Sequence, residues 1–172
     1  MFTLVIGGSG SGKSLLAEGL LEKCAGPRLY IATMEPMDRE SFRRIERHRQ
    51  QRAGKGFDTL ECYKGLSEAA EGLSPQDGIL LECMSNLLAN ELFHPAGGGR
   101  EAALRGVDVL LTRCNDLIIV TNEVFSGGTE YEGDTMWYMK ELAAVNRVLA
   151  QRADTVIEVV CGLPNVLKGV LL

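Results

Sequence analysis

The sequence predicts an α/β fold: a three-layer sandwich in which helices cover both faces of a mostly parallel central sheet. Short apolar runs alternate along the chain with longer segments of helical period, which is the pattern of repeated β-α-β units. Two of the runs, Ile79–Leu81 and Ile118–Val120, are apolar without alternation, as expected of central strands buried on both faces. The 172 residues show no internal repeat and no linker, so we expect one domain spanning 1–172.

Each expected element follows from this alternation. Two stretches, Gly97–Gly99 and 126–133, combine glycines with no apolar period, and we expect mobile loops there. The short apolar runs predict strands at 2–6, 29–32, 58–61, 78–82, 117–121 and 155–160. The segments of helical period predict helices near 13–24, 38–53, 66–72, 85–93, 101–114 and 135–152.

The charge and hydropathy of the chain restrict its partners. With 18 basic and 23 acidic side chains the net charge is −5, which disfavours binding to nucleic acid or to an acidic membrane, because both need basic groups spread over a surface. No apolar run approaches the roughly 20 residues of a membrane span, so none is expected. The apolar N-terminus lacks a preceding basic region, which disfavours a signal peptide.

The five cysteines are odd in number and widely spaced, and no two form a C-x-x-C pair. Neither a zinc site nor a disulfide framework is therefore expected. We interpret them as small buried side chains in a reducing compartment, and we expect a cytoplasmic protein.

A phosphate-binding loop follows the first expected strand. Eight residues fit the pattern G-x-x-x-x-G-K-S, with a strand before them and a helical pattern after them, as the motif requires. Glycines let backbone N–H groups point at a triphosphate, and the helix N-terminus adds partial positive charge. The lysine would reach the β- and γ-phosphates, and the last serine would bind Mg²⁺. We therefore expect a P-loop NTPase-like fold that binds a nucleotide through Gly7, Gly8, Ser9, Gly10, Ser11, Gly12, Lys13 and Ser14.

A second metal-side group is expected at the tip of a neighbouring strand. Glu82 ends the buried run Ile79–Leu81, at the carboxyl edge of the sheet, where ligands of open α/β sheets bind. We therefore interpret Glu82 as the partner of Ser14 at the metal, with a helix-capping role as the alternative.

One segment is strongly basic although the chain is acidic. Between Arg39 and Lys55 there are seven basic residues and two acidic ones, so the segment carries +5 and the remainder carries −10. Arg44, His48 and Arg52 recur every four residues and would form one stripe on a helix, where they could meet a phosphate chain.

His48 is the only imidazole in this segment. Because neighbouring guanidinium charges disfavour a second cation, we expect a lowered pKa and a neutral, nucleophilic ring at pH 7. The other histidine, His94, precedes Pro95 at an expected helix end and is interpreted as a cap or surface residue.

With these motifs the chain resembles the family of bifunctional adenosylcobinamide kinases / adenosylcobinamide-phosphate guanylyltransferases of cobalamin assembly. The phosphate loop, the run Tyr30–Thr33 and the pattern R-I-x-x-H-[RK]-x-x-R over Arg44–Arg52 carry the resemblance. Further matches are Leu80–Cys83, Asn90–Phe93, Val120–Val124, Val145–Asn146 and Leu149–Asp154, so the resemblance spans nearly the whole chain.

The resemblance implies two reactions in one P-loop domain. The kinase phosphorylates the aminopropanol hydroxyl of adenosylcobinamide with a nucleoside triphosphate, ATP or GTP. The guanylyltransferase transfers GMP from GTP through a guanylylated histidine, which would be His48. The resemblance also implies Mg²⁺ as cofactor and the corrinoid as second substrate. It implies nucleotide or metal contacts from Ala32, Thr33, Met34, Arg49, Gln50, Gln51, Arg52, Glu61 and Glu82.

The chain departs from the family pattern at two places. Gly10 stands where the family usually has an arginine in its phosphate loop. The stretch 125–134 replaces a segment with proline and arginine, and it carries three carboxylates instead of cations.

Two other functions remain open from the sequence. One is a nucleotide-binding homologue that has lost kinase or transferase activity. The other is a different small-molecule P-loop kinase, in which the basic helix would be a lid over the transferring phosphoryl group. We also expect a homo-oligomer, because helices cover both faces of the sheet and the termini are apolar, and the resemblance implies a trimer.

Overall fold

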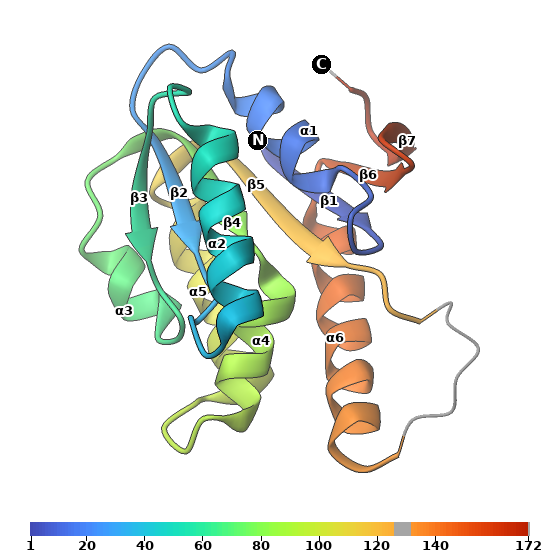
Figure 1. Cartoon of the computed structure of the whole chain (residues 1–172). Helices are drawn as coiled ribbons and strands as arrows, with labels where there is room; N and C mark the ends of the chain where they lie inside the picture. The colour runs from blue at the N-terminus through green and yellow to red at the C-terminus, as the bar shows by residue number, and fades with distance from the viewer. Residues whose placement is uncertain (126–131, 172) are drawn as a thin grey trace.

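One sheet runs through the computed structural model, which describes residues 1–125 and 132–171 (Figure 1). In these residues seven strands pair in the order β3-β2-β4-β5-β1-β6-β7. All neighbours are parallel except β7, which pairs antiparallel with β6. The strands are β1 (Phe2–Gly7), β2 (Arg28–Ala32), β3 (Phe57–Glu61), β4 (Gln76–Glu82), β5 (Cys114–Asn122), β6 (Thr155–Val160) and β7 (Leu163–Lys168).

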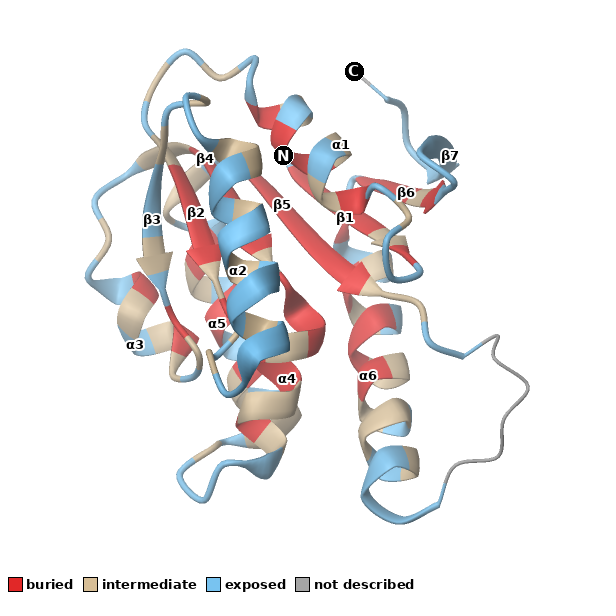
Figure 2. Ribbon diagram, viewed as in Figure 1, coloured by how far each residue is buried: buried red, intermediate tan, exposed pale blue. Residues whose placement is uncertain are grey.

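Helices cover both faces of this sheet, which confirms the predicted three-layer α/β sandwich. The helices α1 and α2 lie on one face, and α3 to α6 lie on the other (Figures 1 and 2). Their bounds are α1 (Lys13–Leu21), α2 (Arg39–Arg52), α3 (Leu66–Glu71), α4 (Met84–Phe93), α5 (Gly99–Leu111) and α6 (Gly133–Arg152).

The central strands are buried on both sides, as their unbroken apolar runs predict. On β4, Ile79 and Leu81 pack into the larger core under α3 to α6, whereas Leu80 points to the smaller core under α1. On β5, Ile119 faces the larger core and its neighbour Ile118 the smaller one. Alternate residues of each apolar run therefore serve two cores, which is why these runs show no polar alternation.

The structure differs from the sequence prediction at the end of the chain and at two helix ends. The sequence does not predict strand β7, because all six of its residues are exposed and Pro164 interrupts its apolar pattern. The helix expected to reach Cys24 ends at Leu21, and Cys114 begins β5 rather than ending α5. Each of these ends lies next to a turn, where the apolar period carries no signal.

The register of the sheet brings the last residues of five strands to one edge. Ala32 of β2 lies opposite both Glu61 of β3 and Glu82 of β4, and Gly7 of β1 lies opposite Asn122 of β5. Each of these residues is the last of its strand. Because the strands are parallel, all of them lie at the carboxyl edge of the sheet. The phosphate loop and α2 therefore lie at an edge where five neighbouring strands, β1 to β5, end.

Of the two segments expected to be mobile loops, one is held in place and the other lies mostly outside the described residues. The Gly97–Gly99 segment is held by α4, because the buried carboxylate of Glu91 accepts hydrogen bonds from the backbone N–H groups of Gly98 and Gly65 at 2.8 Å each. Of the stretch 126–133, residues 126–131 lie outside the described part of the chain. None of the described helices is long and apolar enough to span a membrane.

The packing of α5 against α3 gives a test of this fold. Gly106 of α5 is buried, and a Cβ there would lie 2.6 Å from Cβ of Leu66 at the start of α3. We expect Gly106→Ala to lower the free energy of unfolding by about 1–3 kcal/mol, because overpacking outweighs the gain in helix propensity. Urea denaturation followed by circular dichroism measures the change.

Gly19 of α1 provides the matched control. It is exposed, and a Cβ there meets no atom within 4 Å. We expect Gly19→Ala to raise the free energy of unfolding by about 0.5–1 kcal/mol through helix propensity alone. If both variants shift stability in the same direction, the close approach of α5 to α3 is wrong.

Candidate active site

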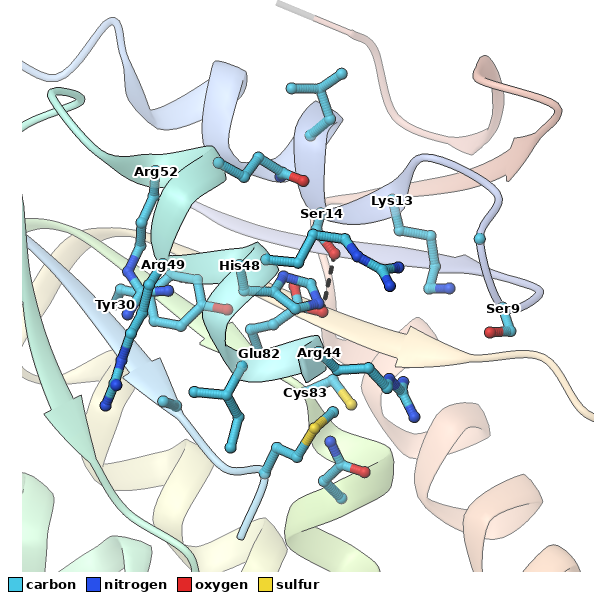
Figure 3. A pocket seen from close by; sticks show the side chains of 18 of the residues that line it. Ser9, Lys13, Ser14, Tyr30, Arg44, His48, Arg49, Arg52, Glu82 and Cys83 are labelled. Atoms are coloured by element: carbon cyan, nitrogen blue, oxygen red, sulfur yellow. Dashed lines mark hydrogen bonds between the residues drawn. The ribbon is translucent and has the colours of Figure 1, made fainter. Parts of the chain in front are cut away.

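A cavity of about 380 Å³ opens at the carboxyl edge of the sheet, between the phosphate loop and α2. Its lining residues come from the loop after β1, from α2 and from the ends of β2, β3, β4 and β5. Figure 3 shows side chains of the loop, of α2 and of β4 pointing into this space. The edge that the parallel register assembles is thus hollowed into one chamber.

The phosphate loop has the backbone shape that its glycines permit. Gly10 and Gly12 have φ of 72° and 97°, which side chains with a Cβ rarely adopt. A Cβ at Gly7 would lie 2.5 Å from the carbonyl oxygen of Val159. The Lys13 Nζ donates a hydrogen bond to the Gly8 carbonyl at 2.6 Å, and burial lowers the pKa of this lysine.

Ser14 and Glu82 are brought together, as the sequence predicts. The Ser14 hydroxyl donates a hydrogen bond to Glu82 Oε1 at 2.9 Å (Figure 3), and Oε2 is buried without a partner. Burial of the carboxyl group raises the pKa of Glu82 to about 7, although the Ser14 hydrogen bond and the Lys13 charge act in the opposite direction. An oxygen pair of this kind, with one oxygen unpartnered, is a donor set that suits Mg²⁺.

The basic segment forms α2, and polar contacts begin and hold it. The N-terminus has a capping box, in which Asp38 accepts from the backbone of Ser41 and Ser41 accepts from the backbone of Asp38. None of the residues of α2 is buried, so no apolar face sets its position. Its orientation therefore depends on hydrogen bonds and ionic contacts at its other end.

Those contacts are made in the last turn of α2 and just beyond it. Arg49 pairs with Glu61 of β3 at 2.6 Å, and the guanidinium of Arg52 lies 4.0 Å from the centre of the Tyr30 ring. On the α1 side, the buried Glu18 accepts hydrogen bonds from Gln51 at 3.0 Å and from Lys55 at 2.7 Å.

His48 points from α2 into the cavity (Figure 3). Its ring is half-buried, and its Nδ1 is buried without a hydrogen-bond partner. Burial is the main cause that lowers its pKa, the charges of Arg44, Arg52 and Arg47 act in the same direction, and Glu18 opposes them. The expected lowering of the His48 pKa is therefore right, but burial of the ring contributes more to it than the charges of the arginines do.

The cavity contains most of the residues expected to contact a nucleotide. Gly7, Gly8, Thr33 and Gln50 do not line it. Gly7 is a buried strand residue, and the carbonyl of Gly8 accepts the hydrogen bond from Lys13. Thr33 is fully buried and exchanges two hydrogen bonds with the backbone of Cys83, and Gln50 donates to Glu46. The expected residues that line the cavity are Ser9, Gly10, Ser11, Gly12, Lys13, Ser14, Ala32, Met34, His48, Arg49, Gln51, Arg52, Glu61 and Glu82.

The predicted stripe of Arg44, His48 and Arg52 also lines the cavity. His94 is the exposed C-cap residue of α4, which agrees with its interpretation as a cap. All five cysteines are free. Cys62 and Cys83 are buried as expected and Cys24 and Cys114 are half-buried, but Cys161 is exposed, so the expected burial is wrong there. The described residues contain no group of three or more histidine, cysteine or acidic side chains able to hold a metal.

Several residues at the site were not found from the sequence. Tyr30 and Asn122 lie within runs that carry the family resemblance but were given no role, and Asn86 is a single amide without a motif, yet all three line the cavity. Glu18 does not line it but holds the helix that carries His48. The signal that could have found Glu18 is its charge, because it lies on the face of α1 that otherwise packs Ala17 and Leu21 into the core.

The chain matches a protein family and is similar to known proteins over nearly its whole length. Residues 3–167 match the family described as cobinamide kinase / cobinamide phosphate guanyltransferase. The bifunctional adenosylcobalamin biosynthesis protein CobU of Salmonella typhimurium is 36% identical, over 95% of this chain and 97% of that protein. The bifunctional adenosylcobalamin biosynthesis protein CobP of Pseudomonas aeruginosa is 34% identical, over 98% of each chain.

A solved ATPase of a bacterial type III secretion system shares the fold, with a TM-score of 0.56 at 12% identity, covering 96% of this chain and 56% of the ATPase. That likeness agrees with a P-loop NTPase-like sheet. The family match covers nearly all of the chain, and the two relatives match 95% and 98% of it. The chain therefore belongs to the cobinamide kinase / cobinamide phosphate guanyltransferase family.

Proposed function

We propose that the protein is a bifunctional transferase: a kinase for adenosylcobinamide and a guanylyltransferase that converts the phosphorylated product to adenosylcobinamide-GDP. One observation carries the proposal. The side chain of His48, whose buried Nδ1 has no hydrogen-bond partner, lines the same cavity as the phosphate loop. A kinase needs the loop alone, whereas a transferase that works through a nucleotidyl-enzyme needs both groups in one chamber.

The guanylyl step uses the neutral imidazole. A ring nitrogen of His48 attacks the α-phosphorus of GTP, a P–N bond forms, the bond to the β-phosphate oxygen breaks, and pyrophosphate leaves. The lowered pKa keeps the lone pair available at pH 7, and the ring proton is lost when the phosphoramidate forms. Arg44 and Arg52, which line the same cavity, stabilise the negative charge that builds up on the phosphate oxygens. The phosphate of the corrinoid then displaces His48 and takes the GMP group.

The kinase step uses the phosphate loop. Lys13 and the backbone N–H groups of 9–14 hold the triphosphate of ATP or GTP, and the aminopropanol hydroxyl of the corrinoid attacks the γ-phosphorus. Gly10, which replaces the arginine usual in the family, lines the cavity, and a Cβ at this position would meet no atom within 4 Å. The loop therefore binds the triphosphate through its backbone and Lys13 rather than through an added guanidinium.

We propose that Mg²⁺ accompanies the nucleotide and that Ser14 and Glu82 hold it. The unpartnered Oε2 of Glu82 and the Ser14 hydroxyl form the oxygen donor set that this ion prefers. When bound, the ion neutralises charge on the phosphate oxygens. Its binding requires the ionised carboxylate of Glu82, whose pKa is raised to about 7 by burial.

Covalent labelling tests the function. We expect incubation with GTP labelled at the α-phosphate, followed by denaturation, to leave an acid-labile label on the protein. His48→Ala should reduce the label to background, because no other described imidazole lines the cavity. His94→Ala, which removes the exposed cap of α4, should label like the parent protein.

Other labelling results decide between the alternatives. No label on the intact protein excludes the guanylyl-enzyme and favours a homologue without transferase activity. Turnover of γ-labelled ATP with adenosylcobinamide, but no α-label, would indicate a P-loop kinase alone.

Isothermal titration tests the Mg²⁺ site. Glu82→Gln keeps an oxygen that can accept from Ser14 but removes the negative charge. We expect it to weaken the binding of a non-hydrolysable GTP analogue in the presence of Mg²⁺ by about ten- to a hundredfold, as for other changes in a metal coordination shell. In EDTA the two proteins should bind the analogue with similar affinity. Equal affinities in Mg²⁺ would contradict the assignment of Glu82.

We propose in addition that the protein is a homo-oligomer, with a trimer as the form that the family resemblance implies. The antiparallel strand β7 lies at the edge of the sheet, and Leu163 and Leu167 on it are 72% and 58% exposed. An exposed apolar edge strand offers unpaired backbone groups with which another chain can pair. Light scattering should give a multiple of the monomer mass, and Leu163→Glu with Leu167→Glu should lower it. A monomer at micromolar concentration would contradict the proposal.

A further inference from the structure

A buried carboxylate links the two helices of the active site. Glu18 lies on α1 one turn after Ser14, and none of its surface is exposed. Both of its oxygens are used: Oε1 accepts from Gln51 at 3.0 Å, and Oε2 accepts from Lys55 at 2.7 Å. The donors belong to the last turn of α2 and to the turn that follows it. One side chain of the phosphate-loop helix therefore holds the helix that carries the nucleophile.

This link is less exposed to water than the Arg49–Glu61 pair that also holds α2. The side chains of Arg49 and Glu61 are about half exposed, at 52% and 48%, so water weakens their attraction. The Lys55 side chain is 20% exposed and its partner Glu18 is fully buried, so their charges interact in a less polar setting. Removing one partner would leave the other buried charge without compensation.

The link also acts at the place that matters for the nucleophile. Gln51 lies three residues after His48 on α2, almost one helical turn, so fixing Gln51 fixes the rotation of the helix about its axis. At the other end, α1 begins with Lys13 and Ser14, which line the cavity at the phosphate loop. Glu18 therefore joins the triphosphate and the attacking ring through two short segments of helix.

The lack of a buried apolar face on α2 makes this contact necessary. None of the fourteen residues of α2 is buried, whereas α1 buries Ala17 and Leu21 against the sheet. Apolar packing therefore fixes α1, and α2 is placed relative to it by polar contacts. A displacement of about 1 Å at a reacting atom can reduce a rate by up to about a hundredfold, so small losses of order in α2 matter.

We propose that Glu18 is a positioning residue for guanylyl transfer: through Gln51 and Lys55 it holds His48 in reach of the nucleotide bound at the phosphate loop. This inference rests on the proposed guanylyl-enzyme. Glu18 itself touches neither nucleotide nor corrinoid, since it does not line the cavity.

The test measures the rate of covalent labelling of His48 by α-labelled GTP as a function of GTP concentration. Glu18→Gln keeps the size of the side chain and removes its charge. We expect the labelling rate at saturating GTP to fall about tenfold and the half-saturating concentration to change less than about threefold, because alignment is lost and the phosphate loop is intact. The melting temperature is measured alongside, to show that the variant is folded.

Lys55→Met removes the same ion pair at its other partner. Because Lys55 lies outside the core, this variant tests the inference even if Glu18→Gln does not fold. We expect a similar loss of rate. The double variant should be no slower than the slower single variant, because both remove one interaction.

Glu22→Gln is the matched control. Glu22 also faces Lys55, at 3.6 Å, but its side chain is 48% exposed. We expect the labelling rate to remain within about twofold of that of the parent protein, as for an exposed pair.

The outcomes separate this inference from the proposed function. If the parent protein is not labelled, the guanylyl-enzyme is wrong and the inference fails with it. If the parent is labelled and Glu18→Gln and Lys55→Met label at the parent rate, only the inference is overturned. Additive losses in the double variant, or a loss confined to the half-saturating concentration, also overturn it.

Discussion

The parallel register of the sheet is the constraint on which the rest of the structure depends. Since β2, β3 and β4 run in the same direction, their final residues Ala32, Glu61 and Glu82 lie side by side at one edge. The loop that follows β1 opens at the same edge. Shifting one strand by a single residue would exchange its two buried faces and separate these groups. The two cores that fix the register therefore also fix the active site.

The site itself combines groups whose pKa values are shifted mainly by burial. Burial raises the pKa of the carboxyl group of Glu82 to about 7 and lowers the pKa values of Lys13 and His48. All three shifts favour the neutral form of each group. In the proposed reaction a triphosphate and its metal ion bring the opposite charges into this space. The neutral state suits His48 as a nucleophile, whereas a bound triphosphate would stabilise the charge of Lys13 and a bound metal ion would stabilise the carboxylate of Glu82.

The helix that carries the nucleophile is attached in a different way from the rest of the molecule. Apolar packing positions α1 and α3 to α6, whereas α2 buries no residue and relies on Glu18, Glu61 and the Tyr30 ring. A polar attachment leaves the arginines of α2 available to a phosphate chain. It also makes the position of His48 depend on a few contacts, most directly on the one with Glu18.

The sequence by itself determined the elements whose signal is local. The glycine-rich loop, the helix with Arg44, His48 and Arg52 on one stripe, and the strand that ends at Glu82 each follow from the period and spacing of neighbouring residues. The order of the strands, the exposed strand β7 and the roles of Tyr30, Asn122 and Glu18 were decided by the tertiary structure. These depend on contacts between residues far apart in the chain: Glu18 meets Lys55 across 37 positions, and no pattern of neighbours encodes that distance. A buried charge is recognised only when its partner is seen, because burial and pairing are properties of the folded chain.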